Sequence, residues 1–444
     1  MNILIVAYYW PPAGGSGVQR WLYMSNHLAD IPGNNLTIYV PDTTDYQVLD
    51  PTLSADISPK LKIIKRPIWD PAHFYNKAVG EKNKIGVGMS SVKEKKSLIQ
   101  KIGLWFRANV FVPDSRVFWV NPSYRFLKKY IEKNKIDVIV TTGPPHSMHL
   151  IGLKLKQYFK EKIIWVADFR DPWSEIQYYE TLKTTKFAFN KIKKLEKKVL
   201  INSDIVTTVT PSWANMFRDI SKRKIEIIEN GYEDSLFEHI KIINQPKRFN
   251  IVHTGVMYAT RNPHNLWNSL RIIKNEIPAF VDLAKIQLIG NLDASVINEL
   301  KNLDLYDITE IYPPMSHKEV IEYQINAALL LLIIDQAKTY ISTAKGMITG
   351  KIYEYFACQR PILGIGPTDG DAARILGDSE YAKMVDWDDL EGIKNFITNI
   401  YQKYINGDKL VVDYHQKELY SRKNLALKFN NILLEYINNK KNNG

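Results

Sequence analysis

The chain of 444 residues contains a single cysteine, Cys358, which excludes an internal disulfide framework and a cysteine-rich metal site. Long apolar runs are also missing. The longest later run, Ala327–Ile334, has the length of a strand and falls well short of a membrane span. The apolar start Met1–Tyr9 is too short for a signal-peptide core and has no basic segment before it, so we expect a first strand. These absences predict a cytoplasmic protein, either free or held peripherally on the inner face of the cytoplasmic membrane.

The charge balance is basic, with a formal net charge of +12. Such a balance favours polyanionic partners, including nucleotide diphosphates and anionic membrane surfaces. The basic residues are dispersed and no nucleic-acid-binding motif is recognised, so we expect no nucleic-acid partner. Hydrophobic residues make up 45% of the chain, which is enough for proper cores, and the length predicts two or three domains.

Short runs rich in Ile and Val alternate with helical patterns, as is typical of buried parallel strands in βαβ units. The first series of expected strands is Asn2–Tyr8, Leu36–Val40, Leu61–Lys65, Asp137–Thr141, Lys162–Ala167, Ile205–Thr210 and Glu226–Ile228. The second series is Phe249–Thr254, Lys285–Ile289, Ile308–Tyr312, Ala327–Ile334, Pro361–Gly364 and Ala382–Val385. Two series in tandem predict an α/β protein with two Rossmann-like, doubly wound parallel-sheet domains, residues 1–243 and 244–405. Residues 406–444 are expected to form helices that pack back toward the first domain.

Glycines after the first strand predict a ligand-binding turn. Gly14 and Gly15 would let the backbone approach a phosphate, and the helix that follows would point its first N–H groups at the same place. A tight turn without a ligand explains the loop equally well. The dinucleotide fingerprint is incomplete because Arg20 stands at the third glycine, so Asp42 after the second strand is weak support for a dehydrogenase.

The second series carries candidate residues for an anionic ligand. Gly255 permits a tight turn after a strand, and Arg261, which opens the next helix, suits a diphosphate. Lys351 and Glu354 lie one helical turn apart at an expected helix start, where a cation and a carboxylate could grip a diphosphate and a ribose. The alternative for Arg261 is a surface arginine at a helix start.

Polar residues also follow two strands of the first series, where sites in such folds lie. His146 could hydrogen-bond a substrate hydroxyl, or face solvent at a helix start, whereas His149 is expected to be structural. Asp168 and Asp171 could position an acceptor hydroxyl or act as a base. A buried, salt-bridged corner is the favoured alternative, because the arginine between them would hold both carboxylates ionised.

These motifs in this order resemble glycosyltransferase family 4, whose members have the GT-B fold. The matching residues are Pro11-Pro12, Gly14-Gly15, Arg20, Asp168–Trp173, Thr210–Ser212, Glu229–Tyr232, Phe237, Gly255, Arg261, Gly350–Glu354 and Pro361. The resemblance implies two domains facing a central cleft. It also implies transfer from a nucleoside-diphosphate sugar to a saccharide or lipid-linked acceptor, with retention of configuration and without a metal or other cofactor.

Site roles follow from the resemblance residue by residue. Glu354 matches the carboxylate that binds the donor ribose, Arg261 the phosphate-binding cation, and Gly15 the backbone near the donor phosphate. His146 resembles the histidine that touches the transferred sugar. With Lys351, Arg261 and His146 form the expected catalytic set, and Arg20 has a structural or acceptor role.

Two positions depart from the family pattern. Val256 stands where the family has an arginine, and Gly346 replaces the glutamate that contacts the donor sugar hydroxyls. Either Lys345 or Lys351 would replace the missing phosphate cation, and we favour Lys351. A nucleotide-sugar epimerase of the same architecture, with Asp168 and Asp171 as its acid–base pair, is the alternative function.

A basic amphipathic stretch, Lys93–Val110, has the pattern of a helix that lies on an anionic membrane and would fit a lipid-linked acceptor. Packing of its apolar stripe on its own domain is the commoner case. Lys183–Leu200 is also basic, but its apolar residues are expected to form an ordinary core stripe.

Overall fold

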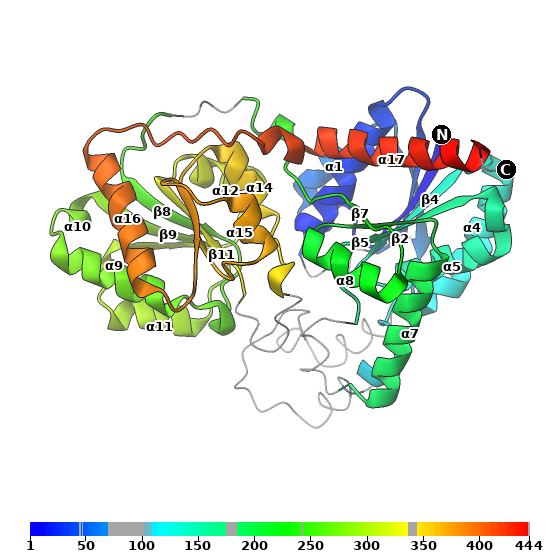
Figure 1. Cartoon of the computed structure of the whole chain (residues 1–444), viewed down its shortest axis with the longest axis horizontal. Helices are drawn as coiled ribbons and strands as arrows, with labels where there is room; N and C mark the ends of the chain where they lie inside the picture. The colour runs from blue at the N-terminus through cyan, green and yellow to red at the C-terminus, as the bar shows by residue number, and fades with distance from the viewer. Residues whose placement is uncertain are drawn as a thin grey trace. The chain divides into compact units, whose positions relative to one another are not determined.

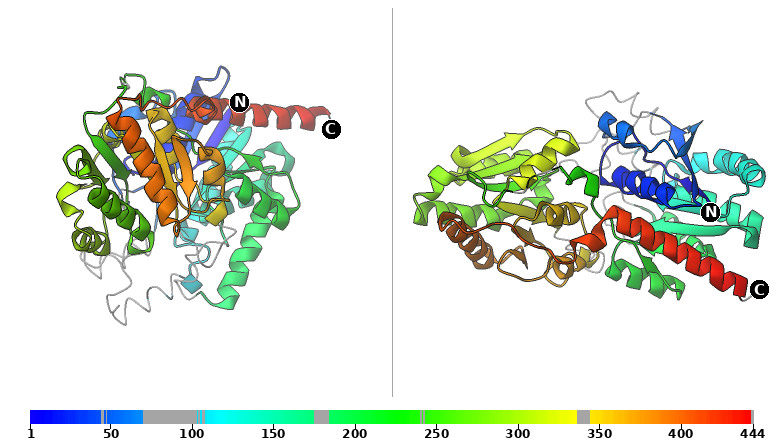
Figure 2. Two further views of the ribbon diagram at one scale, coloured as in Figure 1. Left: turned by 60° about the vertical axis from the view of Figure 1, so that its left-hand side comes forward. Right: turned by 90° about the horizontal axis from the view of Figure 1, so that it is seen from above.

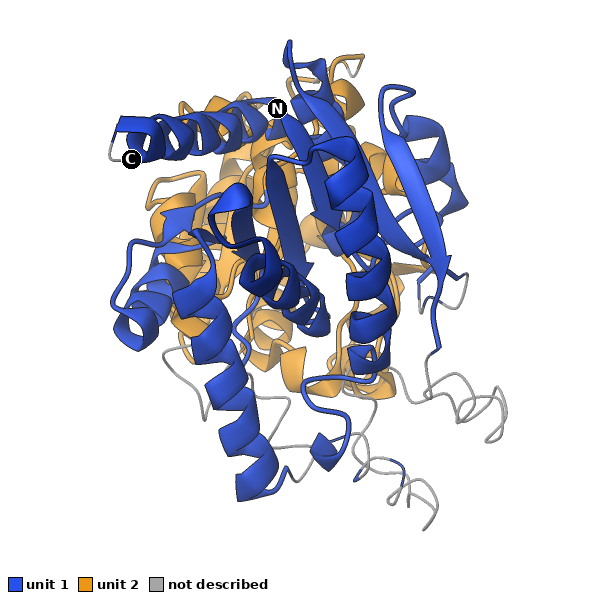
Figure 3. Ribbon diagram, turned by 90° about the vertical axis from the view of Figure 1, so that its right-hand side faces the viewer, with its two compact units in different colours: residues 1–88, 93–230, 422–444 blue, residues 89–92, 231–421 orange. Residues whose placement is uncertain are grey.

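The computed structural model describes the chain except for residues 44–45, 47, 70–102, 104, 106–107, 175–183, 240, 242, 336–343 and 443–444. The chain divides into two compact units (Figure 3). Unit 1 comprises Met1–Gly88, Lys93–Asn230 and Arg422–Gly444, and unit 2 comprises Met89–Val92 and Gly231–Ser421.

Unit 1 contains a seven-stranded parallel sheet in the order β3-β2-β1-β4-β5-β6-β7 (Figure 1). Its strands are β1 (Asn2–Val6), β2 (Asn35–Asp42), β3 (Lys62–Pro67), β4 (Val138–Gly143), β5 (Ile164–Phe169), β6 (Ile205–Thr208) and β7 (Glu226–Ile227). The central strands are buried along nearly their whole length because helices cover both faces, which explains their continuous Ile and Val runs. The main helices are α1 (Ser16–Asp30), α4 (Val117–Asn134), α5 (Ser147–Phe159), α7 (Lys186–Asn202), α8 (Pro211–Ser221) and α17 (Arg422–Asn442).

Unit 2 contains a six-stranded parallel sheet in the order β10-β9-β8-β11-β12-β13. Its strands are β8 (Phe249–Thr254), β9 (Ala284–Ile289), β10 (Thr309–Tyr312), β11 (Leu329–Ile333), β12 (Ile362–Ile365) and β13 (Ala382–Val385). The helices are α9 (His264–Glu276), α10 (Phe280–Leu283), α11 (Ala294–Asn302), α12 (His317–Ile325), α14 (Lys351–Cys358), α15 (Asp371–Leu376) and α16 (Leu390–Ile405). Every strand expected from the sequence is present in one of the two sheets, so the predicted fold of two doubly wound parallel-sheet domains is confirmed.

The last helix, α17, belongs to unit 1 although unit 2 separates it from the rest of that unit in the sequence. Figure 2 shows it lying beside α1. Leu425, Ala426, Phe429 and Leu433 join the core of unit 1, and the Phe429 ring meets Trp21 edge-on at 5.7 Å. The two units therefore meet in sequence at residues 230/231 and again at 421/422, whereas the sequence analysis placed its boundaries at 243/244 and 405/406.

Candidate functional site

The carboxyl ends of β8 and β9 in unit 2 meet at two glycines that no other residue could replace without strain. Gly255 has φ +109° and Gly290 has φ +129°. A Cβ atom on Gly290 would lie 2.4 Å from the carbonyl oxygen of Gly255, and one on Gly255 would lie 2.6 Å from Lys351 Nζ. The turn after β8 therefore keeps its backbone bare directly beside a lysine.

Lys351, the first residue of α14, carries the cation at this turn. Burial, and to a smaller extent the nearby charge of Arg261, lower its pKa to about 8, although Glu354 opposes both effects. His253, on β8 just before the turn, is buried, and burial together with Lys351 and Arg261 holds its pKa well below the usual range. A positive charge is thus held where water is scarce, as an anionic ligand requires.

Arg261 is paired with Asp335, a residue that the sequence analysis did not single out. Its Nε and Nη2 groups donate to the two carboxylate oxygens of Asp335, which follows β11. Both side chains are partly exposed. The described residues offer no hydrogen-bond partner to Nη1, so this edge of the guanidinium can still meet a ligand. Arg261 ends a short 3-10 turn, Ala259–Arg261, and α9 begins only at His264, so the expectation that Arg261 opens the next helix is wrong.

Glu354 lies one turn after Lys351 on α14 and contacts a second residue absent from the sequence analysis. His317 Nε2 lies 2.9 Å from Glu354 Oε1, and both side chains are mostly buried. Because an ionised carboxylate only accepts, the histidine donates from Nε2. His317 begins α12, directly after Ser316, whose capping box with Glu319 marks this helix start in the sequence.

Gly255, Arg261, Lys351 and Glu354 therefore lie together at one edge of the unit 2 sheet. Lys345, the alternative cation, is instead paired with Asp369. Within the described residues, no three His, Cys, Asp or Glu side chains gather in a way that could hold a metal ion.

In the loop after β1 of unit 1, Gly14 is packed against neighbouring residues, whereas Gly15 has open space beside it. Gly14 donates its N–H to Val48 O at 2.9 Å, and a Cβ on Gly14 would touch Asp50. Gly15 precedes α1 with φ +94°, is exposed, and has open space where a side chain would stand. No side chain of the described residues caps the first turn of α1. A ligand could approach Gly15 more closely than Gly14.

Asp168 is the centre of a fully buried network. It accepts hydrogen bonds from Arg20 Nη2 (3.0 Å) and, at 2.8 Å each, from Trp21 Nε1, Thr142 Oγ1 and Thr207 Oγ1. Burial alone would raise its pKa, but Arg20 and the hydrogen bonds hold the pKa below its ordinary value. Four donors fill the lone pairs of the carboxylate, so Asp168 and Arg20 are structural rather than acceptor-binding in this arrangement.

Arg170 does not bridge the two aspartates as the sequence analysis expected. It donates instead to the carbonyl oxygens of Gly17 (3.0 Å), Gly143 (3.2 Å) and Pro144 (2.7 Å), which ties the first turn of α1 to the end of β4. Burial raises the pKa of Asp171 despite the charge of Arg170. The Arg170 guanidinium is thus occupied by backbone carbonyl oxygens. Asp171 lacks the four side-chain donors that surround Asp168 in the described structure.

His146 is buried, so the solvent-facing alternative for it is wrong. Its ring stacks on Trp173 at 5.1 Å, and neither ring nitrogen has a partner among the described residues. Burial, with His149 and Arg170, holds its pKa well below the usual range, so the imidazole is neutral. His149 contacts Thr141 Oγ1 at 2.9 Å and stacks on Phe169.

The corner after β5 is fixed from α7 by Glu196. This buried carboxylate accepts from the backbone N–H groups of Trp173 (2.9 Å) and Ser174 (3.3 Å). This contact could not be predicted from the sequence, because Glu196 stands among lysines with which it could have paired on the surface.

Comparison with protein families gives a direct match to part of the chain. Residues 91–236 match the family model described as Glycosyltransferase Family 4. The findings support a glycosyltransferase of the family 4 type. Among curated proteins, no sequence match was found for this chain.

Solved glycosyltransferases share the fold along nearly the whole chain. A sucrose-phosphate synthase from Thermosynechococcus elongatus is 15% identical, with TM-score 0.60 and coverage of 98% of this chain and 99% of the other. A glycosyltransferase from Rickettsia africae is 14% identical, with TM-score 0.61 and 98% coverage of both chains. A mutant of TarM from S. aureus, in complex with fondaparinux, α-GlcNAc-glycerol and UDP, is 11% identical, with TM-score 0.57 and coverage of 97% and 99%. At such identities the likeness shows the GT-B fold.

A structure described as a putative UDP-N-acetylglucosamine 2-epimerase from Listeria monocytogenes is a weaker match to this chain. It is 9% identical, with TM-score 0.51 and 94% coverage of both chains. The epimerase architecture is therefore related, but less similar.

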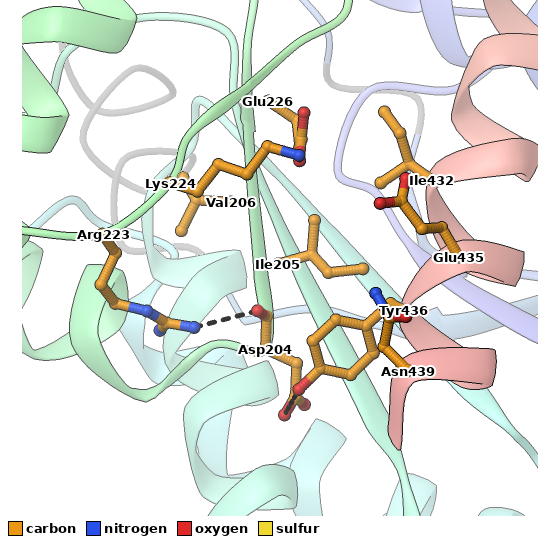
Figure 4. A pocket seen from close by; sticks show the side chains of 10 residues that line it. All are labelled: Asp204, Ile205, Val206, Arg223, Lys224, Glu226, Ile432, Glu435, Tyr436 and Asn439. Atoms are coloured by element: carbon orange, nitrogen blue, oxygen red, sulfur yellow. Dashed lines mark hydrogen bonds and ion pairs between the residues drawn. The ribbon is translucent and has the colours of Figure 1, made fainter. Parts of the chain in front are cut away.

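Figure 4 shows a cavity of about 340 Å³ in unit 1, at the edge of the sheet where β6 and β7 begin. This edge is opposite to the carboxyl ends of the strands. Asp204, which lines it, accepts from Tyr436 Oη at 3.0 Å and pairs with Lys156 at 2.7 Å, and its carbonyl oxygen accepts from Arg223 at 3.0 Å. These polar groups are occupied by one another, and the cavity holds none of the site residues expected from the sequence.

Most of Lys93–Val110, the expected membrane segment, lies outside the described residues. No helix within the described part of the chain has the length and apolar character needed to cross a membrane.

Proposed function

We propose that the protein transfers a sugar from a nucleoside-diphosphate sugar to a hydroxyl acceptor, with retention of configuration, in polysaccharide, lipopolysaccharide or glycolipid synthesis. The observation that carries the proposal is the half-buried Lys351 beside the bare backbone of Gly255, with Arg261 close enough to lower its pKa. Two cations at the carboxyl end of β8 suit a diphosphate, because parallel sheets bind ligands at that edge.

Lys351 and Arg261 would stabilise the leaving group. As the bond between the sugar and the diphosphate breaks, negative charge grows on the phosphate oxygen, and preorganised cations in a dry site stabilise it most. Arg261 would use its Nη1 edge, since Asp335 holds Nε and Nη2. The acceptor hydroxyl would attack the same face of the sugar, with its proton passing to a donor phosphate oxygen.

The remaining roles come from the family resemblance. Glu354, held by His317, would bind the ribose, and the Gly15 backbone would approach the donor phosphate. His146, a neutral imidazole with a free ring nitrogen, would contact the transferred sugar. We propose that the reaction uses no metal or other cofactor. The location proposed is the cytoplasm, at the inner face of its membrane.

A thermal-shift screen against UDP-, GDP-, dTDP- and ADP-sugars tests the donor site, because a ligand of the folded state raises the melting temperature. One nucleotide family should raise it in the wild type and in Lys345→Met, and should fail to do so in Lys351→Met. A shift that survives in Lys351→Met and disappears in Lys345→Met would move the phosphate site to Lys345. No shift with any donor would refute the site.

The epimerase remains the second candidate because Asp171 is a half-buried carboxyl whose pKa is raised by burial, as an acid–base group requires. Product analysis without an acceptor separates the two functions. A transferase leaves the sugar configuration of the donor unchanged, whereas an epimerase converts the donor alone.

A further inference from the structure

The outward face of α7 is strongly and uniformly basic. Its one acidic residue, Glu196, is buried against the backbone of residues 173–174 and contributes nothing to the outer surface. Every lysine of the helix is exposed, namely Lys186, Lys191, Lys193, Lys194, Lys197 and Lys198. The helix therefore presents six positive charges and no carboxylate on its outer surface.

Apolar side chains stand at both ends of this basic stripe. Phe187 is 80% exposed and Ile201 is 46% exposed, although the inward side of the helix already packs on the core through Ala188, Ile192 and Val199. The spacing of Phe187, Lys191, Lys194, Lys198 and Ile201 alternates between four and three residues, which places them on one face. Packing among the described residues of unit 1 does not account for an exposed phenylalanine in that position.

Other exposed apolar side chains lie next to the first turn of α7. The N–H of Thr185 donates to Asn109 Oδ1 at 2.6 Å, and Asn109 in turn donates to Trp105 O at 3.0 Å. Trp105 is 47% exposed, and Val110, beside Asn109, is 50% exposed. In Figures 1 and 3 this end of α7 projects beyond the sheet of unit 1.

We propose that the α7 face, defined as its six lysines with Phe187, Ile201, Trp105 and Val110, docks on an anionic lipid membrane. Lysines attract the negative headgroups, and the exposed aromatic and aliphatic side chains enter the headgroup boundary. The combination favours a membrane over nucleic acid, since isolated apolar side chains on the rim of a basic face gain nothing from a phosphate backbone. Binding to the membrane stands apart from the donor site of unit 2, so either proposal can fail alone.

The test is flotation of the full chain with vesicles of phosphatidylcholine alone or mixed with phosphatidylglycerol. The wild type should float only with the anionic vesicles and should be released by salt. Each lysine near an anionic surface contributes about five-fold in affinity, so Lys191→Gln, Lys194→Gln and Lys198→Gln together should weaken binding about 10²-fold. Phe187→Ser should weaken binding while leaving its salt dependence unchanged.

A matched control removes three exposed lysines of unit 2, with Lys247→Gln, Lys301→Gln and Lys409→Gln, and should float as the wild type does. The circular dichroism spectrum of each variant shows whether it is folded. Equal flotation of the α7 triple variant and the control would overturn the proposal, as would equal binding to neutral and anionic vesicles. Lysine-dependent capture of DNA without vesicle binding would assign the face to nucleic acid instead.

Discussion

Replacing Lys351 by methionine should stabilise the protein while removing donor binding. Burial is the main reason that the pKa of Lys351 falls from its ordinary 10.5 to about 8. That change corresponds to about 3 kcal/mol against the charged form in the folded state at pH 7. Methionine has a similar length and no charge, so Lys351→Met avoids this cost. The figure of about 3 kcal/mol already includes the attraction of Lys351 to Glu354, because that attraction contributes to the pKa of about 8.

The stability advantage of Lys351→Met over the wild type should depend on pH. The folded-state pKa lies below the unfolded-state value, so the unfolded chain binds more protons between about pH 8 and 10.5. The cost of the charged lysine is therefore fully present below pH 8 and disappears as the pH rises through this window. The advantage of Lys351→Met should be largest at pH 7 and nearly absent above pH 10.5.

Urea denaturation of the full chain at pH 7 and pH 10.5, for wild type and variant, measures this difference. We expect a higher midpoint for Lys351→Met at pH 7 and loss of the nucleotide-sugar thermal shift in the same variant. Lys383→Met, which removes an exposed lysine of β13, is the matched control and should change neither. A lower midpoint for Lys351→Met at pH 7 would refute the idea of an unfavourably buried functional charge.

Four further predictions follow from the same contacts. The kcat/KM for the donor should fall about ten-fold per pH unit above pH 8 as Lys351 loses its proton, and Lys351→Arg should move this limb beyond pH 10; a flat profile in the wild type would exclude the charge requirement. Gly255→Ala should weaken donor binding at least ten-fold, measured by titration, because its Cβ would lie 2.6 Å from Lys351 Nζ. Asp335→Asn should raise the donor KM with little change in kcat, since Arg261 loses the partner that orients it; an unchanged KM would show that other contacts orient it. Asp168→Asn should lower the free energy of unfolding by about 3–5 kcal/mol, measured with urea, because Arg20 is left buried without its counter-ion.

The sheets could be predicted because buried parallel strands appear in sequence as unbroken apolar runs. β4 and β11 are buried over their whole length, so Ile, Leu and Val patterns alone locate them. The turn at Gly255 could also be predicted, because a glycine directly after a strand indicates a tight turn. The positive φ of Gly255 agrees with this. The end of β8, where Gly255 lies, could therefore be located from the sequence.

The partners of the site residues could not be predicted, because each contact joins segments distant in sequence. Asp335 lies 74 residues after Arg261, and His317 lies 37 residues before Glu354. Nothing local distinguishes such a residue from an ordinary polar residue at the end of a strand or at the start of a helix. Glu196 shows the same limit, since its sequence neighbours suggest a surface ion pair while its partners include backbone N–H groups and the Ser174 hydroxyl.

The return of α17 to unit 1 has a consequence for synthesis on the ribosome. Unit 2 can fold as soon as Ser421 has left the exit tunnel, because Gly231–Ser421 already contains its whole sheet. The core of unit 1, although its strands are made first, waits for Leu425, Phe429 and Leu433 to cover Trp21 and its neighbours. Apolar surface on α1 therefore stays exposed throughout the synthesis of unit 2, and a nascent chain stalled before α17 is a natural target for chaperones.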